Sequence, residues 1–410
     1  MTGPEAARRL LASPILRRIA ALADEGEVLL VGGSVRDRLL GLPSHDHDLV
    51  TTGDPAVLAR TLARAFHGRN FLLGHPPKAV WRVVAGPHAF DLWGVESTLE
   101  RDIRRRDFTV NALVWRLPRG PLIDLVQGLD DLAAGRLCVV AAENLRDDPL
   151  RVLRGLRLVA TRPQLALTTE SERQLGEAAA GLARVARERI TDELRLLLAG
   201  PAVRRALAGA QRTGALAALA PGWATVKDNE AVLAQAQALQ RLRAGAGSTL
   251  GAGASSVAAA LLAAPAAGFP ARWDEAAAAE ELERIGFPRR AARRLAAAAG
   301  RGEQLARAGL APGGESRVTL LDAAEPAAAA AWAVARLGPA ALPAARALLC
   351  WRRRFVARAP LVGGDELVEV LGLPEGPARA RVIRELVVAR ARGEVRSRRQ
   401  ALAFLRSSLC

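Results

Sequence analysis

The sequence is poor in cysteine and has no long apolar run. Its three cysteines, Cys138, Cys350 and Cys410, are far apart, and none belongs to a CxxC motif. This distribution argues against a disulfide framework or a zinc cluster and fits a reducing compartment. No apolar run reaches the ~18 residues of a membrane span, and early arginines interrupt any signal-peptide core. We therefore expect a cytoplasmic protein with no membrane segment.

Lysine and histidine are also scarce. Lys78 and Lys227 are the only lysines, so arginine supplies nearly all the positive charge of a chain whose net charge is +16. That charge attracts polyanions and makes nucleic acid the leading partner class, with a solvated basic surface as the alternative. All five histidines lie at or before His88. This excludes a histidine-based phosphohydrolase domain in the remainder of the sequence.

The pattern of the chain changes along its length, and 410 residues suggest two or three domains. Up to about residue 125, short strand-like runs alternate with helical segments, as in domains of mixed structure. The strand-like runs are 27–31, 47–51, 79–84, 88–93 and 111–115. Helical periodicity dominates from residue 147, and the alanine-rich segments after residue 200 are expected to form closely packed helices. The sequence thus predicts an α+β fold, with a mixed-sheet head followed by an all-α neck, body and tail.

The stretch VGGSVRDRLLGLPSHDHDLV, residues 31–50, places two carboxylates just beyond a glycine-rich turn. In a strand, Asp46 and Asp48 point to the same face, roughly 6.5–7 Å apart along the chain. That spacing suits two divalent ions, and Mg²⁺ prefers such oxygen ligands and completes its shell with substrate phosphates. His45 and His47 would then point to the opposite face, where packing or surface polar contacts account for them.

The turn before these carboxylates has the features of a phosphate site. Gly32, Gly33 and Ser34 expose backbone N–H groups at a predicted helix start, and Arg36 adds a forked, permanently charged donor. The stretch is not a P-loop, since no GK[ST] follows, nor a dinucleotide fingerprint, since GxGxxG is absent. A phosphate site followed by a carboxylate pair indicates nucleotidyl transfer, in which metal ions activate a hydroxyl and stabilise the leaving pyrophosphate.

Three segments resemble one known family. VGGSVRDRLLGLPSHDHDLVT resembles the first motif of the class II tRNA nucleotidyltransferases and bacterial poly(A) polymerases, the CCA-adding family of the polymerase-β-like superfamily. RRDFTVNAL, at 105–113, is similar to the second motif, and DDPLRVLRGLRL, at 147–158, is similar to a later one. ERI and Glu193, at 188–193, give a weaker similarity. The segments follow the family order.

The resemblance implies a nucleotidyltransferase head at 1–145, a helical neck with a base-reading helix at 146–200, and a tRNA-binding body and tail at 201–410. It implies that Asp46 and Asp48 are the catalytic residues and hold Mg²⁺. The implied nucleotide-binding residues are Gly32, Gly33, Ser34, Arg36, Arg105, Arg106, Asp107, Asn111, Asp148, Arg151, Arg154 and Arg157. The implied activity is template-independent transfer of CMP from CTP to the tRNA 3′ end with release of pyrophosphate, with AMP transfer from ATP left open.

In this family, side chains instead of a template read the incoming base, and the matching positions are Asp148 and Arg151. At i and i+3 on a helix they can share a face and present an acceptor and a forked donor to a base edge. A local helix pair is the alternative. Arg154 and Arg157 would contact nucleotide or primer, or else brace the helix. Asp91 is either a third acidic residue near the metal ions or a polar residue on an exposed strand face.

The sequence departs from the family pattern before the second motif. Members that complete CCA have a longer connection there, whereas the short segment at 94–100 resembles the CC-adding subgroup. Poly(A) addition to RNA 3′ ends is an alternative, although it would favour a longer basic extension than the arginine-rich segment at 390–399. That segment is either a strip of phosphate contacts or a solvated helix face. A noncatalytic RNA-binding role is the other alternative, and the intact Asp46, Asp48 and Arg106 count against it.

Overall fold

A computed structural model gives the fold of the chain as two compact units, Met1–Val185 and Ala186–Cys410. The structure describes residues 10, 13–22, 27–74, 79–95, 98–117, 120–225, 230–244, 252, 258–264, 267–311, 313–358, 360–369, 372 and 375–407. Lys78, Lys227 and Cys410 lie outside the described residues. The predicted domain limits at 145 and 200 stay predictions.

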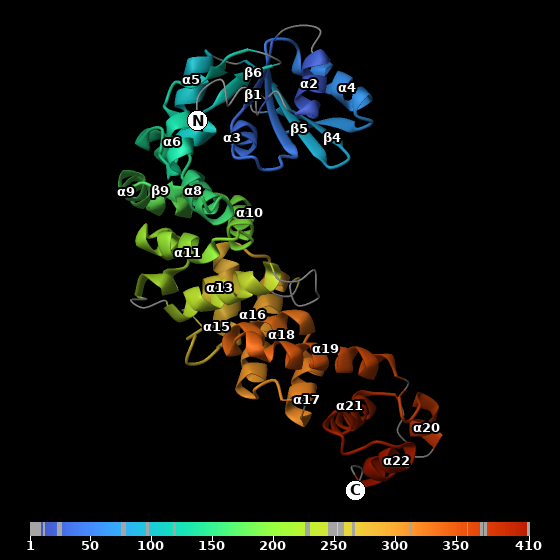
Figure 1. The fold of residues 1–410 in the computed structure, drawn as a ribbon. Coiled ribbons are helices and arrows are strands. Elements are labelled where there is room, and N and C mark those ends of the chain that lie inside the picture. Colours follow the sequence, from blue (N-terminus) through green and yellow to red (C-terminus); the bar gives the residue numbers. More distant parts are fainter. Residues whose placement is uncertain are drawn as a thin grey trace. The chain divides into compact units, whose positions relative to one another are not determined.

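The N-terminal unit contains a mixed seven-stranded sheet (Figure 1). Its strands are β1 (Val28–Val31), β2 (Asp46–Thr51), β3 (Arg69–Leu73), β4 (Val80–Ala85), β5 (His88–Gly94), β6 (Val114–Arg116) and β7 (Leu122–Ile123). The strand order is β3-β4-β5-β2-β1-β6-β7, in which β2 and β5 are parallel and the other neighbours are antiparallel. The predicted mixed-sheet head is confirmed.

Four of the five strand-like runs form strands near their predicted bounds. The prediction for 111–115 is wrong in its first half, because Thr109–Asn111 forms the 3-10 helix η1 and the strand begins only at Val114. Alternation of side chains does not distinguish such a turn from a strand. The sequence pattern also misses β3, an edge strand whose residues are mostly exposed, and the two-residue β7.

The helices of the N-terminal unit surround this sheet and extend beyond it. They are α2 (Pro14–Ala21), α3 (Gly33–Leu39), α4 (Pro55–Ala65), α5 (Leu99–Arg104), α6 (Gly128–Ala134), α7 (Ala142–Asp147), α8 (Leu150–Thr161), α9 (Thr169–Ala178) and the 3-10 helix η2 (Ala179–Arg184). Two short strands, β8 (Arg136–Leu137) and β9 (Ala166–Leu167), form a parallel pair among them. The sequence did not indicate this pair.

One face of β2 changes from polar to apolar along the strand. Asp46, Asp48 and Val50 alternate onto the same face, and Val50 is buried in a hydrophobic cluster with Leu29 of β1 and Ile103 of α5. The two carboxylates therefore stand where the apolar face of the sheet ends.

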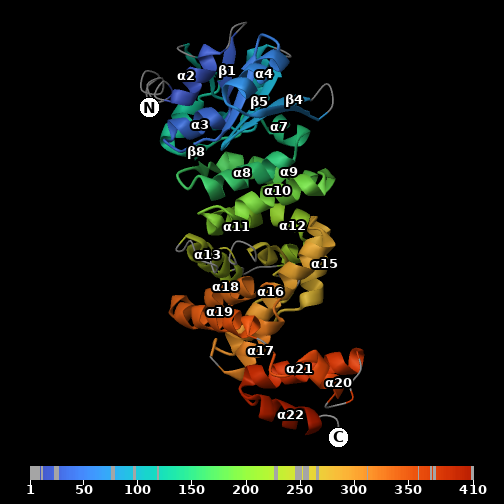
Figure 2. The same ribbon diagram turned by 90° about the vertical axis from the view of Figure 1, so that its right-hand side faces the viewer.

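The C-terminal unit is helical throughout its described residues. Its α-helices are α10 (Arg187–Leu198), α11 (Val203–Arg212), α12 (Ala215–Leu219), α13 (Glu230–Ala244), α15 (Glu275–Ile285), α16 (Arg289–Arg307), α17 (Gly314–Asp322), α18 (Pro326–Leu337), α19 (Leu342–Ala357), α20 (Gly364–Glu369), α21 (Pro377–Arg392) and α22 (Arg398–Ser407). The 3-10 helices are η3 (Pro221–Thr225), η4 (Ala258–Ala263) and η5 (Pro339–Ala341). Helices α20, α21 and α22 pack around one hydrophobic cluster (Figure 2). No described helix is both long enough and apolar enough to cross a membrane.

The alanine-rich segments pack closely, as predicted. Ala328–Ala331 of α18 are buried, and Gly302 of α16 leaves so little room that a Cβ there would lie 2.6 Å from Cβ of Trp332. The Trp332 indole N–H donates to buried Glu303 at 2.7 Å. Small residues thus let the two helices approach, and one tryptophan fills the space between them.

Candidate active site

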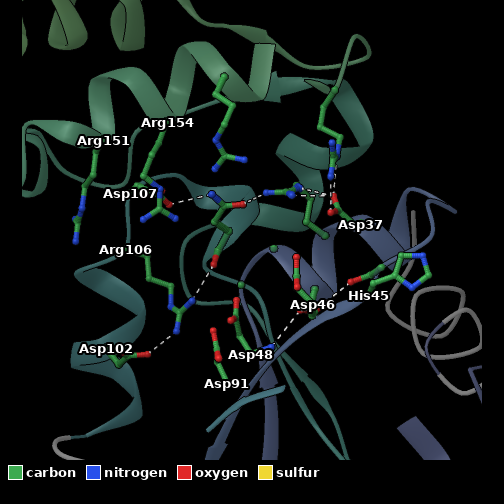
Figure 3. A pocket seen from close by; sticks show the side chains of 18 of the residues that line it. Asp37, His45, Asp46, Asp48, Asp91, Asp102, Arg106, Asp107, Arg151 and Arg154 are labelled. Atoms are coloured by element: carbon green, nitrogen blue, oxygen red, sulfur yellow. Dashed lines mark hydrogen bonds and ion pairs between the residues drawn. The ribbon is translucent and has the colours of Figure 1, made fainter. Parts of the chain in front are cut away.

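A polar cavity of about 830 Å³ opens in the N-terminal unit (Figure 3), a size within the usual range for small-molecule sites. Every predicted site residue except Asp148 lines it. The other lining residues are Asp37, Pro43, Ser44, His45, Arg82, Asp91, Asp102 and Arg162. Eight arginines and six aspartates face the cavity, so its charge suits a polyanion.

Three carboxylates meet on one face of the sheet. Asp46 and Asp48 share a face of β2, and Asp48 stands in register with Asp91 on parallel β5. Burial raises the pKa of Asp48 to about 6; the charge of Arg106 opposes the rise, and the charges of Asp91 and Asp46 add to it. Of the two predictions for Asp91, its position favours the third acidic residue.

Arg82 on β4 binds the carboxylate of Asp91. Arg82 Nε and Nη2 donate to the two carboxylate oxygens of Asp91 at 2.7 and 2.6 Å. A forked pair of this kind holds the carboxylate in one orientation. The Asp91 carboxylate is therefore fixed in place beside Asp48.

The donor set at β2 fits Mg²⁺. Among the described residues, no group of three or more histidine, cysteine, aspartate or glutamate side chains could hold a metal ion by itself. Mg²⁺ is commonly bound by one or two carboxylates, with water and substrate phosphates completing its shell. Asp46 and Asp48 could hold the ion in this way, with the arginine-rich side of the cavity left for the phosphates.

The glycine turn brings α3 against β2. Gly32 has a left-handed φ of 70°, and a Cβ there would lie 2.8 Å from Nη1 of Arg106. The Ser34 hydroxyl donates to the Asp46 carbonyl at 2.7 Å and accepts from the Asp48 N–H at 3.3 Å. This hydroxyl fixes the start of the helix to the strand that carries both carboxylates.

A chain of buried polar contacts links the first two motifs to α8. Arg36 Nη1 donates to Asn111 Oδ1, and Asn111 Nδ2 donates to Asp107 Oδ1 at 3.0 Å. Asp107 Oδ2 lies 3.2 Å from Arg154 Nε. Burial opposes the charge of Asp107, but Arg154 and the hydrogen bonds from Asn111 and the Phe108 N–H hold its pKa below the usual range. Arg154 thus forms an ion pair with the second motif, and its predicted contact with nucleotide or primer stays a prediction.

The other arginines of the second motif are also held in place. Arg106 Nη2 donates to Asp102 Oδ2 of α5 at 2.9 Å, and the Arg105 carbonyl accepts from Arg151 Nη1 at 2.6 Å. Arg151, Arg154 and Arg157 are all half-buried on the cavity side of α8. The structure therefore assembles the three motifs around one cavity.

The prediction that Asp148 and Arg151 share a helix is wrong. Helix α7 ends at Asp147, Asp148 has φ −138° and ψ 89°, and α8 begins at Leu150. Pro149 explains the break, because a proline disfavours the helical conformation of the residue before it. The Asp148 carbonyl accepts from the Arg151 N–H at 3.0 Å, so its backbone supports the first turn of α8.

The two histidines beside the carboxylates differ. His47 is buried, with Nδ1 3.1 Å from Arg38 Nη2 and Nε2 3.1 Å from His88 Nδ1. Burial and the nearby charge of Arg38 lower the pKa of His47 to about 3, so it is a neutral packing residue, as predicted. His45 also lines the cavity, but its ring packs against His88 at a centroid distance of 5.4 Å, in agreement with the predicted packing role. It precedes the first residue of β2, so the strand alternation does not set its direction.

Asp37 and Arg162 are the main site residues that the motif assignments missed. Both line the cavity and bind one another. Asp37 follows Arg36 directly and could have been noticed on that ground. Arg162 has no local signal, since it acts on a residue 125 positions away.

Comparisons with known proteins agree with this geometry. Residues 28–92 and 88–138 match the family described as the poly A polymerase head domain, and residues 164–226 match the probable RNA and SrmB-binding site of polymerase A. The A-adding tRNA nucleotidyltransferase of Deinococcus radiodurans is 40% identical over 192 residues, 46% of this chain and 43% of that protein. The CC-adding tRNA nucleotidyltransferase of Synechocystis is 37% identical over 194 residues, 47% of this chain and 46% of that protein. The chain spans about half the length of the curated relatives it matches.

Solved structures share the fold over nearly the whole chain. The CCA-adding enzyme of Thermotoga maritima in complex with tRNA superposes with a TM-score of 0.69 at 20% identity, covering 100% of this chain and 99% of that one. A CCA-adding enzyme in complex with ATP gives a TM-score of 0.75 at 20% identity, covering 99% and 98%. The sequence matches therefore show that residues 28–138 belong to the poly A polymerase head family, and the solved structures show that the chain shares the fold of CCA-adding enzymes.

Proposed function

We propose that this protein is a template-independent tRNA nucleotidyltransferase that transfers CMP from CTP to the tRNA 3′ end and releases pyrophosphate. One observation carries the proposal. A single cavity combines Asp46 and Asp48, the Gly32–Ser34 turn and the arginines of α8. Untemplated nucleotidyl transfer needs three parts. They are carboxylates for the metal ions, a turn whose N–H groups can bind phosphate, and side-chain donors that can bind a base.

At phosphorus the reaction forms one bond and breaks one, and the proton of the attacking hydroxyl passes to water. The 3′ oxygen of the tRNA bonds to the α-phosphorus of CTP, the bond from that phosphorus to the bridging oxygen breaks, and pyrophosphate leaves with the electron pair. Mg²⁺ held by Asp46 and Asp48 would favour ionisation of the hydroxyl and neutralise charge on the phosphates. Arg36 and Arg106 lie on the phosphate side, where fixed donors favour the more negative transition state.

Base selection falls to α8 in this proposal. Arg151 presents a guanidinium at the cavity, held by the Arg105 carbonyl. The cytosine N3 and O2 atoms are acceptors that such a fork can meet. Asp148 would contribute through its carbonyl, which supports the Arg151 backbone. That the Asp148 side chain accepts a hydrogen bond from the base stays a prediction.

The C-terminal unit would hold the tRNA. The match to an RNA-binding family at 164–226 reaches into this unit, and its helices expose many arginines. Helix α19 alone carries Arg346 and Arg352–Arg354. Arginine contacts to phosphates bind RNA by shape and charge without reading its sequence.

The number and kind of nucleotides added are open. The relatives include A-adding, CC-adding and CCA-adding enzymes, so A addition to a tRNA ending in CC is a second candidate, supported by the 40% identity to the Deinococcus enzyme. The short 94–100 connection, which led us to expect CC addition, includes residues 96–97 outside the described residues. Poly(A) addition is the further alternative, since the head match bears that family name.

Three tRNA transcripts test these possibilities together. They end at the discriminator base, after one C and after CC, and each is incubated with Mg²⁺ and CTP, ATP or both before products are resolved to one nucleotide. CC addition predicts growth by two C residues with no A added to the CC-ended tRNA. Extension of the CC-ended tRNA alone identifies A addition, and completion of every transcript identifies full CCA addition. Long A tails would indicate a poly(A) polymerase, and no growth of any transcript would reject the transferase function.

A further inference from the structure

Helix α8 ends at Thr161, and the next residue, Arg162, reaches across to α3. Arg162 Nε and Nη2 donate to Oδ1 and Oδ2 of Asp37 at 2.8 and 2.6 Å. Arg162 Nη1 also donates to the Thr161 carbonyl at 3.0 Å. Because a guanidinium is planar and its donors form a rigid fork, these three bonds fix its orientation.

Asp37 shares its carboxylate with its neighbour Arg36. Oδ1 accepts from Arg36 Nε at 2.9 Å, and Arg36 and Asp37 are only 5% and 8% exposed. Burial alone would raise the pKa of Asp37, but the hydrogen bonds and charges of Arg162 and Arg36 hold it below 3.8. Burial and the charges of Arg162 and Arg157 disfavour the Arg36 cation, and Asp37 is the counter-charge that opposes them.

The other end of Arg36 leads back to α8. The contacts run from Arg36 through Asn111 and Asp107 to Arg154 in the middle of that helix. Because Arg162 directly follows the last residue of that helix, the polar contacts and the backbone of α8 together close a ring. Arg36 is the member of this ring that belongs to the glycine-turn motif, and both ends of its guanidinium are held before any ligand arrives.

We infer that Arg162 is a positioning residue for nucleotide binding. Through Asp37 it holds the Arg36 guanidinium toward the triphosphate, and it joins the phosphate end of the cavity to the helix that carries Arg151. The inference rests on the proposed nucleotidyl transfer. Arg162 needs no contact with substrate for this role, since three of its N–H donors already fix it to Asp37 and Thr161.

Loss of this positioning role should change ligand affinities in a way that a general loss of stability would not. Without Arg162, the Asp37 carboxylate is free to turn and Arg36 loses its fixed direction, so a preorganised donor to phosphate is lost. The loss concerns the phosphates alone. It must therefore be equal for every nucleotide and for inorganic triphosphate, and it must vanish when Arg36 is already absent.

The test uses the full chain and four variants: Arg162→Ala, Arg162→Lys, Arg36→Ala and the Arg36→Ala/Arg162→Ala double variant. Calorimetric titration with Mg²⁺ gives the Kd of CTP, ATP and inorganic triphosphate, and each protein's Tm is recorded. Arg162→Ala should weaken all three ligands by a common factor of about tenfold to a hundredfold. Arg162→Lys should restore part of that loss. In the Arg36→Ala background, Arg162→Ala should change nothing further.

The matched control is Arg136→Ala. Arg136 Nε lies 2.8 Å from the buried Asp131 of the same unit, and it does not line the cavity. Its loss should lower Tm without altering any Kd. If Arg162→Ala fails to fold, Arg162→Lys replaces it in the test. Its affinity for all three ligands should then fall by a common but smaller factor.

Three results would overturn the positioning role. They are unchanged Kd values despite a lowered Tm, a loss confined to one nucleotide, and a loss of full size in the Arg36→Ala background. Failure of the proposed function gives a different result: the wild type would bind triphosphates yet extend no tRNA, and the affinities would still decide the role of Arg162. A wild type that binds no triphosphate would overturn both.

Discussion

Asp48 on strand β2 stands in register with Asp91 on the parallel strand β5. The two carboxylates face the same cavity, but only Asp91 is neutralised by a forked arginine pair, with Arg82. Asp48 is left with burial and two neighbouring negative charges, and its pKa rises to about 6 although Arg106 opposes the shift. A carboxylate in this state gains by binding a divalent cation in place of a proton.

Replacement of Asp48 by asparagine should therefore abolish transfer while leaving tRNA binding intact. Loss of a metal ligand removes several kcal/mol of transition-state stabilisation, so kcat should fall at least about a thousandfold. Asp46→Asn should behave alike. Extension of a tRNA transcript by one nucleotide measures the effect, and Glu100→Gln, which alters an exposed acid paired with Arg104, is the control. Normal turnover in Asp48→Asn would remove this residue from the metal site.

Gly32→Ala should impair nucleotide binding more than Gly41→Ala. Both glycines have a φ near 70°, a backbone conformation that an alanine adopts only with strain. They differ in surroundings: a Cβ at Gly32 would meet Arg106 Nη1 at 2.8 Å, whereas nothing lies within 4 Å of a Cβ at Gly41. Both variants should lose stability, and only Gly32→Ala should raise the KM for CTP. An equal KM for CTP in the two variants would show that nucleotide binding does not depend on the present position of Arg106.

Arg151→Ala should relax the choice of nucleotide. A well-placed forked donor discriminates between bases by roughly 1–3 kcal/mol, so the preference for CTP over UTP should fall about tenfold or more. The measurement is kcat/KM for each nucleotide on one tRNA. Arg146→Ala, on the exposed side of α7 where Arg146 pairs with Glu143, is the control. An unchanged CTP preference in Arg151→Ala would exclude this side chain from base reading.

Asp37 should make the protein sensitive to acid. Its pKa lies below 3.8 in the folded state, so its ionised form contributes stability that is fully present above 3.8 and is lost as the pH falls through the folded value. The groups that face it are Arg36, Arg38 and Arg162. At neutral pH, Asp37→Asn should be less stable by about 3 kcal/mol because a buried pair is broken.

That stability gap should narrow below pH 3.8, where Asp37 of the wild type takes up a proton. Urea unfolding midpoints of the wild type and Asp37→Asn at a series of pH values measure the gap. Asp107 also has a lowered pKa, so both proteins should still lose stability in acid. A gap that stays constant with pH would contradict the ion pairing of Asp37.

Local patterns were enough to predict much of the site. The alternation in DHDLVT predicts β2 and the shared face of its two aspartates, and the motif residues around the glycine turn reach the cavity as expected. A break before α8 was readable from Pro149, although the helix assignment overlooked it. These features are determined by residues that are close together in the sequence, so they can be predicted from one sequence.

Other parts of the site depend on tertiary packing. The register that sets Asp48 beside Asp91 follows from the pairing of β2 with β5, which no local pattern specifies. The pair between Asp37 and Arg162 joins residues 125 positions apart and arises only when α8 packs against the head. Side-chain pairs of this kind leave no periodic signal, and one sequence cannot reveal them.

The surface of α19 gives a prediction for the C-terminal unit. Arg353 and Arg354 are exposed on this helix, and the neighbouring Trp351 and Phe355 rings contact one another in a tilted arrangement at a centroid distance of 4.9 Å. Exposed arginines beside aromatic rings suit a phosphate backbone. The Arg353→Gln/Arg354→Gln double variant should bind tRNA more weakly, and its slope of log K against log salt should decrease by about one for each phosphate that is no longer neutralised.

The control for α19 is a pair of arginines that already have carboxylate partners. Arg284 pairs with Glu281 and Arg294 with Glu325, so their guanidinium charge is largely compensated within the protein. Arg284→Gln/Arg294→Gln removes the same formal charge from the same unit, and its salt slope should stay near that of the wild type. Equal decreases in both double variants would mean that net charge alone attracts the tRNA. A decrease confined to Arg353→Gln/Arg354→Gln would identify α19 as a phosphate-binding surface, because only a released counterion at a specific site changes the slope.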